Sequence, residues 1–212
     1  MIWSSAQPHS VKFMVDRVFG DRARHLIAVW DRTYFGLTPK QYHAKTPTVK
    51  DLRRPWISLP EPYSHSRRTT LLLDDSVDKA QQQPNNHICL TEYTAARRKL
   101  DCQTRLRVLQ HSTMDIADPS YDSILLAMVG IIEAARNQPD VAKWLATGGL
   151  RKIDTQHNPI SEYNATKGNQ STPLNDVSGL WFDDPDVLRF WTRRGQETLS
   201  KLDIPIIPGV VL

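Results

Sequence analysis

The sequence predicts an α/β protein with a parallel sheet in its first part and a mostly helical extension in its second. Two observations predict the sheet. Short apolar runs such as 69–73 end in polar residues, as buried parallel strands do at the carboxyl edge of a sheet. Strand-like and helical segments also alternate. Beyond residue 95 the apolar residues recur at helical spacing. We expect a sheet domain over residues 1–95 and an extension over 96–212.

In the sheet domain, Met1-Ile2-Trp3 predicts the end of a strand, with Ser4 and Ser5 at its tip. A helix follows, because Pro8 suits a first helical turn, where its missing N–H would be unpaired anyway, and Gly20 supplies the stop. Leu26–Trp30 predicts a second short buried strand.

The stretch 31–68 is irregular and contains five prolines. Thr69–Leu73 then predicts a strand, followed by a loop or short helix to Gln83. Residues 84–86 predict a turn, and His87–Leu90 a further strand.

In the extension, one broad apolar face predicts a helix over about 124–135, and a shorter helix covers about 140–146. Residues 151–180 are polar and predict a long loop. Asp184 as cap and Pro185 at the first position predict the start of a final helix. Four aromatic residues lie near this helix, and we expect them to pack in the core rather than to bind a peptide: Trp181, Phe182, Phe190 and Trp191.

Composition excludes several classes of function. The net charge of +4 is mild, and the short basic clusters predict solvated surface rather than a nucleic-acid site. Cys89 and Cys102 form no CxxC pair, which argues against a metal–thiolate site. No secretory signal and no run of 18 apolar residues is visible. We therefore expect an intracellular protein, nuclear or cytoplasmic, without a membrane span.

The sharpest chemical signal is the pair Asp74-Asp75, which ends the predicted strand and precedes Ser76. Two carboxylates at the carboxyl edge of a parallel sheet suit Mg²⁺, which prefers hard oxygen ligands. The alternative is a strand-ending turn in which an aspartate caps the next segment.

Four motifs give a resemblance to a known family. They occur in this order: Ile2-Trp3-Ser4-Ser5-Ala6-Gln7-Pro8, Val49-Lys50-Asp51-Leu52, Leu71-Leu72-Leu73-Asp74-Asp75-Ser76 and Pro84-Asn85-Asn86. The order resembles the NLI-interacting-factor-like phosphatase domain of the haloacid dehalogenase superfamily, also found in phosphatases of the RNA polymerase II C-terminal domain. The resemblance covers about residues 1–93 and implies a Mg²⁺-dependent phosphatase of phosphoserine or phosphothreonine proteins or peptides.

The resemblance also implies roles for individual residues. Ser4, with Ser5 beside it, would hold a phosphoryl oxygen, although either serine could instead cap the following helix. Lys50 would offset charge on the phosphoryl group and on a neighbouring carboxylate. Asp74 and Asp75 would be ligands of Mg²⁺.

The chain departs from the family in one respect. The family's nucleophile and general acid lie in an Asp-x-Asp-x-Thr motif on the central strand, and these 212 residues contain no such motif. The run Asp183-Asp184-Pro185-Asp186 does not replace it, because it begins a helix. The sequence starts in what would be the family's second strand. We therefore expect absent or vestigial activity, weak Mg²⁺ binding, and a sheet that either has unpaired neighbours or closes the gap.

Three functions remain open at this point. The chain resembles a phosphatase domain without its nucleophile. It could be a non-catalytic binding module that uses Ser4 and Lys50, or its helical extension, in the manner of the family's mitochondrial translocase receptor. It could also be a truncated gene product without independent function.

Overall fold

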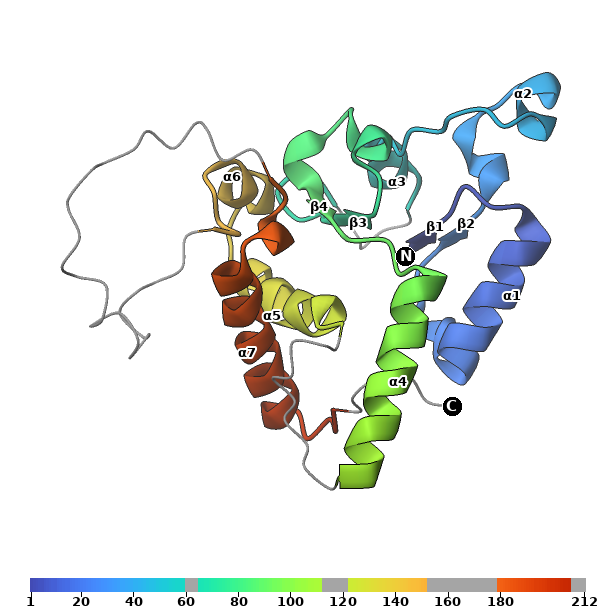
Figure 1. Cartoon of the computed structure of the whole chain (residues 1–212). Coiled ribbons are helices and arrows are strands. Elements are labelled where there is room, and N and C mark those ends of the chain that lie inside the picture. Colours follow the sequence, from blue (N-terminus) through green and yellow to red (C-terminus); the bar gives the residue numbers. More distant parts are fainter. Residues whose placement is uncertain (60–64, 112–121, 152–178, 207–212) are drawn as a thin grey trace. The chain divides into compact units, whose positions relative to one another are not determined.

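A computed structural model describes residues 1–59, 65–111, 122–151 and 179–206 (Figure 1). It mixes helices with small parallel sheets, as an α/β sequence predicts. The chain divides into two compact units: residues 1–89 with 140–142, and residues 90–139 with 143–212. Whether each unit is a domain, with the boundary expected at residue 95, stays a prediction.

The first unit begins with a strand–helix–strand arrangement. Strand β1 (Ile2–Trp3) pairs in parallel with β2 (Val29–Trp30), and α1 (Pro8–Phe19) connects them. Trp3 and Trp30 lie edge to face with ring centroids 5.1 Å apart, and Phe35 completes this small buried cluster. The second strand is shorter than predicted, since pairing begins only at Val29.

The second strand pair carries the predicted acidic tip. Strand β3 (Leu72–Asp74) pairs in parallel with β4 (His87–Cys89), in register Asp74 with Cys89. Buried Asn86, just before β4, donates to the carbonyls of Arg67 and Thr70 at 2.6 and 2.7 Å. This amide therefore holds the turn at 84–86 against the chain that enters β3.

One expectation for this unit was wrong. The irregular stretch contains short helices, namely α2 (Pro39–His43), α3 (Arg53–Ser58) and a 3-10 turn at Arg32–Phe35. A capping box between Thr38 and Gln41 explains α2. The four described strands form two separate parallel pairs, so the gap that the sequence led us to expect is not closed by pairing between them.

The second unit is helical, as expected. It contains α4 (Ala95–His111), α5 (Ile124–Arg136), most of α6 (Val141–Ala146, whose first two residues belong to the first unit) and α7 (Pro185–Lys201). Asp184 caps α7 by accepting from the N–H groups of Asp186 and Val187. Trp181 and Trp191 are buried, which confirms core packing for these two aromatics. The predicted loop lies mostly outside the described residues.

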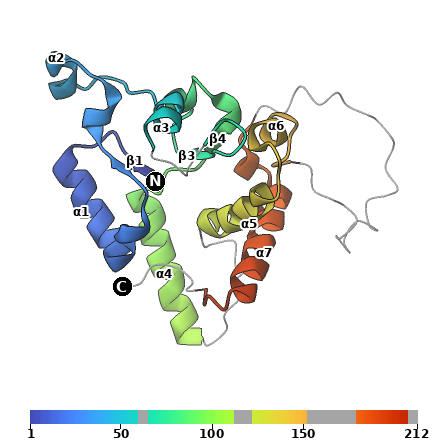
Figure 2. The same ribbon diagram turned by 180° about the vertical axis from the view of Figure 1, so that it is seen from behind.

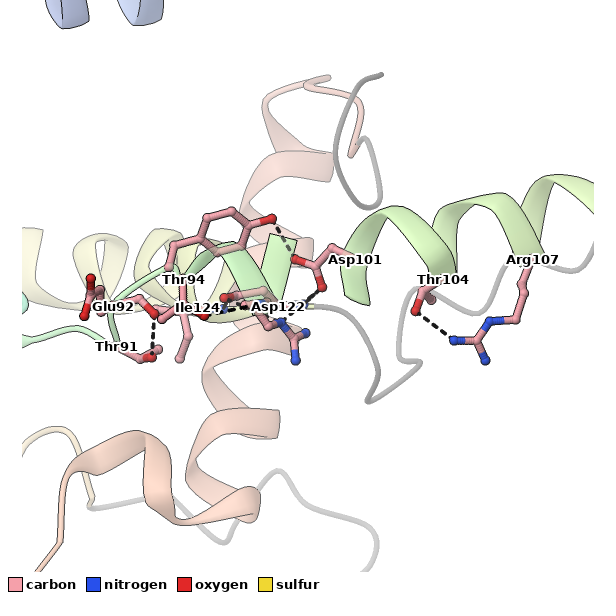
Figure 3. A network of polar contacts seen from close by, with 10 residues as sticks. Thr91, Glu92, Thr94, Asp101, Thr104, Arg107, Asp122 and Ile124 are labelled. Atoms are coloured by element: carbon pink, nitrogen blue, oxygen red, sulfur yellow. Dashed lines mark hydrogen bonds and ion pairs between the residues drawn. The ribbon is translucent and has the colours of Figure 1, made fainter. Parts of the chain in front are cut away.

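Helices α5 and α7 pack closely, and Figure 2 shows the pair from behind. Their backbones approach at Gly130 and Gly195, where an added Cβ would meet the main chain of the other helix. Near the start of α4, buried Asp101 accepts from the Tyr93 hydroxyl at 3.0 Å and forms an ion pair with Arg97 at 3.1 Å (Figure 3). Burial, then the Asp101 hydrogen bond, raises the pKa of Tyr93 to about 12.

Along the described ranges, no helix has the length and apolar character that crossing a bilayer requires.

Candidate functional site

The chemistry-bearing residues of the first unit follow the ends of β1 and β3. At the end of β3, Asp74 is buried because its side chain points to the same side as Leu72, whereas the side chains of Leu73 and Asp75 are exposed. The alternation of a strand thus separates the two aspartates that the sequence places together.

Lys50 lies beside Asp74. Its ammonium group is 2.6 Å from Asp74 Oδ2, and the two side chains are only 8% and 4% exposed. Lys50 is held in place by its own main chain, since its N–H donates to the carbonyl of Lys79 at 2.8 Å. The structure therefore brings together two residues that lie 24 positions apart in the sequence.

Asp74 receives three further contacts. The N–H of Ser76 donates to Oδ1 at 2.9 Å, and the Lys79 ammonium group lies 3.7 Å from the same oxygen. The carbonyl oxygen of Asp74 is 3.0 Å from His87 Nε2. Burial raises the pKa of the Asp74 carboxyl, but Lys50, Ser76 and Lys79 together outweigh burial and hold it below its ordinary value.

Asp51 and Gln83 fix the segment that follows Lys50. Gln83 accepts from the N–H of Leu52 and donates to Asp51 Oδ1, both at 2.9 Å. The hydrogen bond from Arg53 is the main reason that the pKa of Asp51 falls to about 2. Asp51 therefore stabilises the segment that follows Lys50, and its carboxylate already accepts hydrogen bonds from Arg53 and Gln83.

Ser4 and Ser5 occupy the loop between β1 and α1, and both are partly buried. Ser4 donates its N–H to the carbonyl of Trp30 at 2.8 Å, and its hydroxyl accepts from the N–H of Ala6 at 3.2 Å. The alternative role as a helix cap is wrong for both serines, because α1 begins after Gln7, which makes no side-chain capping bond.

The structure joins some predicted site residues and not others. Lys50 and Asp74 are in direct contact, and Asp75 follows in the chain with an exposed side chain. Among the hydrogen bonds and ion pairs of the described residues, none joins Ser4 or Ser5 to Lys50 or Asp74.

Two residues of this region were not singled out from the sequence. Lys79 contacts Asp74 through a turn that no local pattern marks. Arg32 is buried, and its guanidinium donates to four main-chain carbonyls: Ser5, Gln41, Tyr42 and Ala44. The available signal for Arg32 was its place two residues beyond Trp30, at the carboxyl end of a predicted strand.

The described residues do not by themselves form a magnesium site. Both oxygens of Asp74 already face lysine ammonium groups, which leaves the exposed Asp75 as the available carboxylate of the predicted pair. Within the described ranges, no group of three or more His, Cys, Asp or Glu side chains could hold a metal ion. Magnesium binding through Asp74 and Asp75 stays a prediction that needs further oxygen ligands.

Comparison with known proteins supports the resemblance seen in the motifs. No family model matches the chain. An uncharacterized FCP1 homology domain-containing protein of Schizosaccharomyces pombe is 34% identical over 101 residues, which are 45% of this chain and 41% of the relative. The matched stretch thus spans less than half of the relative's length. This similarity confirms the resemblance recognised from the motifs: over the matched stretch the chain is similar to a protein named for an FCP1 homology domain.

Proposed function

We propose that the first unit is a phosphoryl-binding region of haloacid dehalogenase type, and that these 212 residues bind a phosphorylated protein segment without hydrolysing it. The observation that carries the proposal is the buried Lys50–Asp74 pair at the carboxyl end of β3. A buried ion pair is costly to desolvate, so it is weak evidence for stability alone and favours a functional role.

The loop of Ser4 and Ser5 supports the same proposal. It lies between the end of a parallel strand and the start of a 12-residue helix, where N–H groups and the helix dipole favour anions. Ser4 is partly exposed as a residue and has a place in a matching family motif. In this proposal the two serines hold phosphoryl oxygens, and Lys50 adds positive charge.

Two features of the sheets support a haloacid dehalogenase arrangement with a vacant strand position. The two strand pairs are both parallel, and neither pair is bonded to the other. Isolated two-stranded sheets are marginal, and parallel sheets are normally larger and covered on both faces. We propose that β1–β2 and β3–β4 are two halves of one sheet, with room for a fifth strand between β1 and β3.

The edge of β1 supports this strand position independently. Ile2 and Ser4 donate their N–H groups toward the second strand, to Ala28 and Trp30, so alternation directs the main chain of Trp3 to the opposite edge. The Trp3 indole N–H is buried and has no hydrogen-bond partner within the described residues. A further strand on this edge would supply acceptors for main-chain donors that are otherwise unpaired.

Binding is tested with inorganic phosphate and with a phosphoserine peptide. Resonances of the Ser4–Gln7 amides should shift on titration, and Ser4→Ala should weaken binding of both probes about tenfold, as expected when a hydrogen bond to a charged group is lost. Ser10→Ala, within α1, is the matched control and should leave affinity unchanged. Equal affinity of Ser4→Ala and the unchanged chain would refute the phosphoryl site.

Catalysis is tested separately. Because these residues contain no Asp-x-Asp-x-Thr motif, the chain alone should show no turnover of a phosphoserine peptide with Mg²⁺. A synthetic apolar strand that carries this motif should bind the chain and restore measurable turnover if the vacant strand position exists. Turnover by the unaided chain would contradict the proposed lack of hydrolysis, and failure of the peptide to bind would contradict the strand position.

A further inference from the structure

The guanidinium of Arg32 links two segments of the first unit. Its Nη1 donates to the carbonyl of Ser5 at 3.4 Å, and its Nε donates to that of Tyr42 at 3.0 Å. Its Nη2 donates to the carbonyls of Gln41 and Ala44 at 3.2 and 2.9 Å. One side chain therefore connects the phosphoryl-binding loop to residues 41–44, on the approach to Lys50.

This environment is unusual for a buried cation. Arg32 is 9% exposed, and within the described part of the chain no carboxylate forms an ion pair with it. Carbonyl oxygens accept from four of its five N–H donors, but they leave its unit of positive charge uncompensated. A buried positive charge beside a loop that would hold an anion raises the local affinity for that anion.

The main chain of Arg32, like its guanidinium, holds the loop of Ser4–Gln7. The N–H of Arg32 donates to the carbonyl of Ala6 at 2.9 Å, while its guanidinium holds the carbonyl of Ser5. In a planar trans peptide the C=O and N–H point in opposite directions. Because the carbonyls of Ser5 and Ala6 point toward Arg32, the N–H groups of Ala6 and Gln7 point away from it. The Ser4 hydroxyl accepts from the N–H of Ala6.

We propose that Arg32 is a positioning residue of the phosphoryl site, which sets the direction of the loop amides of Ser4–Gln7 and ties that loop to residues 41–44. This inference rests on the proposed function. It assigns Arg32 no contact with the phosphoryl group, and the alternative is that Arg32 only stabilises the fold.

The number of N–H donors on the guanidinium decides which substitution tests the inference. Arg32→Lys keeps the charge but has one compact ammonium group, which cannot reach four carbonyls at once. Arg54→Lys is the matched control, because the exposed Arg54 also donates to one main-chain carbonyl, that of Tyr34 at 2.7 Å. Both variants are compared with the unchanged chain by hydrogen exchange and by phosphate titration.

In folded Arg32→Lys, we expect amide exchange at residues 4–7 to accelerate about tenfold and phosphate affinity to fall about tenfold, as when hydrogen bonds of a charged group are lost. Arg54→Lys should change neither. Unchanged exchange and affinity in Arg32→Lys would overturn the inference and leave the proposed function intact.

A second measurement needs no variant. In the unchanged chain, saturating phosphate should slow exchange at residues 42–46 as well as at 4–7, because linkage through Arg32 is reciprocal. Slowing confined to residues 4–7 would overturn the positioning role alone. No slowing at either segment would overturn the phosphoryl site and this inference together.

Discussion

At Asp74, burial and neighbouring charge act on one carboxylate in opposite directions. Burial raises its pKa, and the contacts of Lys50, Ser76 and Lys79 lower it by more, so the pKa in the folded protein lies below the ordinary value of 3.8. The unfolded chain then binds the proton more readily than the folded chain does. Asp74 therefore contributes stability above the ordinary carboxyl pKa, and this contribution is lost as pH falls.

Removal of one partner of the pair should be costly. Lys50→Met leaves the buried Asp74 without its main counter-ion, and we expect the free energy of unfolding to fall by about 3–5 kcal/mol. Urea unfolding at pH 7 measures this. Lys79→Met is the control, because Lys79 is more exposed and lies farther from Asp74, and it should cost less than about 1 kcal/mol.

The pH dependence gives an independent check. Urea unfolding between pH 7 and about pH 2 should show stability falling below the ordinary carboxyl range of about pH 4. In Asp74→Asn this fall should be shallower, because one of the two carboxyls whose pKa is depressed is gone, while Asp51 remains. A profile of the same steepness would show that Asp74 does not carry the acid sensitivity.

At the scale of elements, the crossing of α5 and α7 depends on two glycines. A Cβ at Gly195 would collide with the main-chain carbonyl of Leu126, which cannot move without shifting α5. Gly195→Ala should therefore cost about 1–3 kcal/mol, although alanine normally favours a helix by about 1 kcal/mol. Thermal unfolding measures the loss, and Ser200→Ala, at an exposed position of α7, should be neutral or slightly stabilising.

The start of α7 offers a second test at this scale. Asp184 accepts from two N–H groups of the first turn, so Asp184→Ala should cost about 1 kcal/mol. Asp184→Asn retains a cap acceptor and should remain close to the unchanged chain. Chemical denaturation compares the three proteins, and equal losses in both variants would show that the charge of Asp184, rather than its capping geometry, matters.

At the scale of the whole molecule, the two units should differ in local stability. The α5–α7 pair has the most extensive packing between elements of the described part, whereas each strand pair is two-stranded and very short. We expect amides of α5 and α7 to exchange slowest and those of β1 and β3 faster. Hydrogen exchange measures this, and equally slow exchange in β1 would contradict it.

Local sequence patterns determined most elements. Pro8 and Gly20 bounded α1, Asp184-Pro185 marked the start of α7, and the apolar face at 124–135 gave α5, because caps, prolines and helical periodicity act within a few residues. The short helices α2 and α3 were missed. Their stretch is rich in proline, and the capping box that stabilises α2 is a local signal that was available at Thr38 and Gln41.

The sequence by itself determined the family resemblance and the candidate residues Ser4, Lys50 and Asp74, because the order of motifs along the chain can be recognised without a structure. Only the tertiary structure decided which of them meet. It paired Lys50 with Asp74 across 24 residues, turned Asp75 to solvent, and surrounded Arg32 with carbonyls. Contacts between distant segments depend on how strands pair and side chains alternate, and no local pattern encodes that geometry.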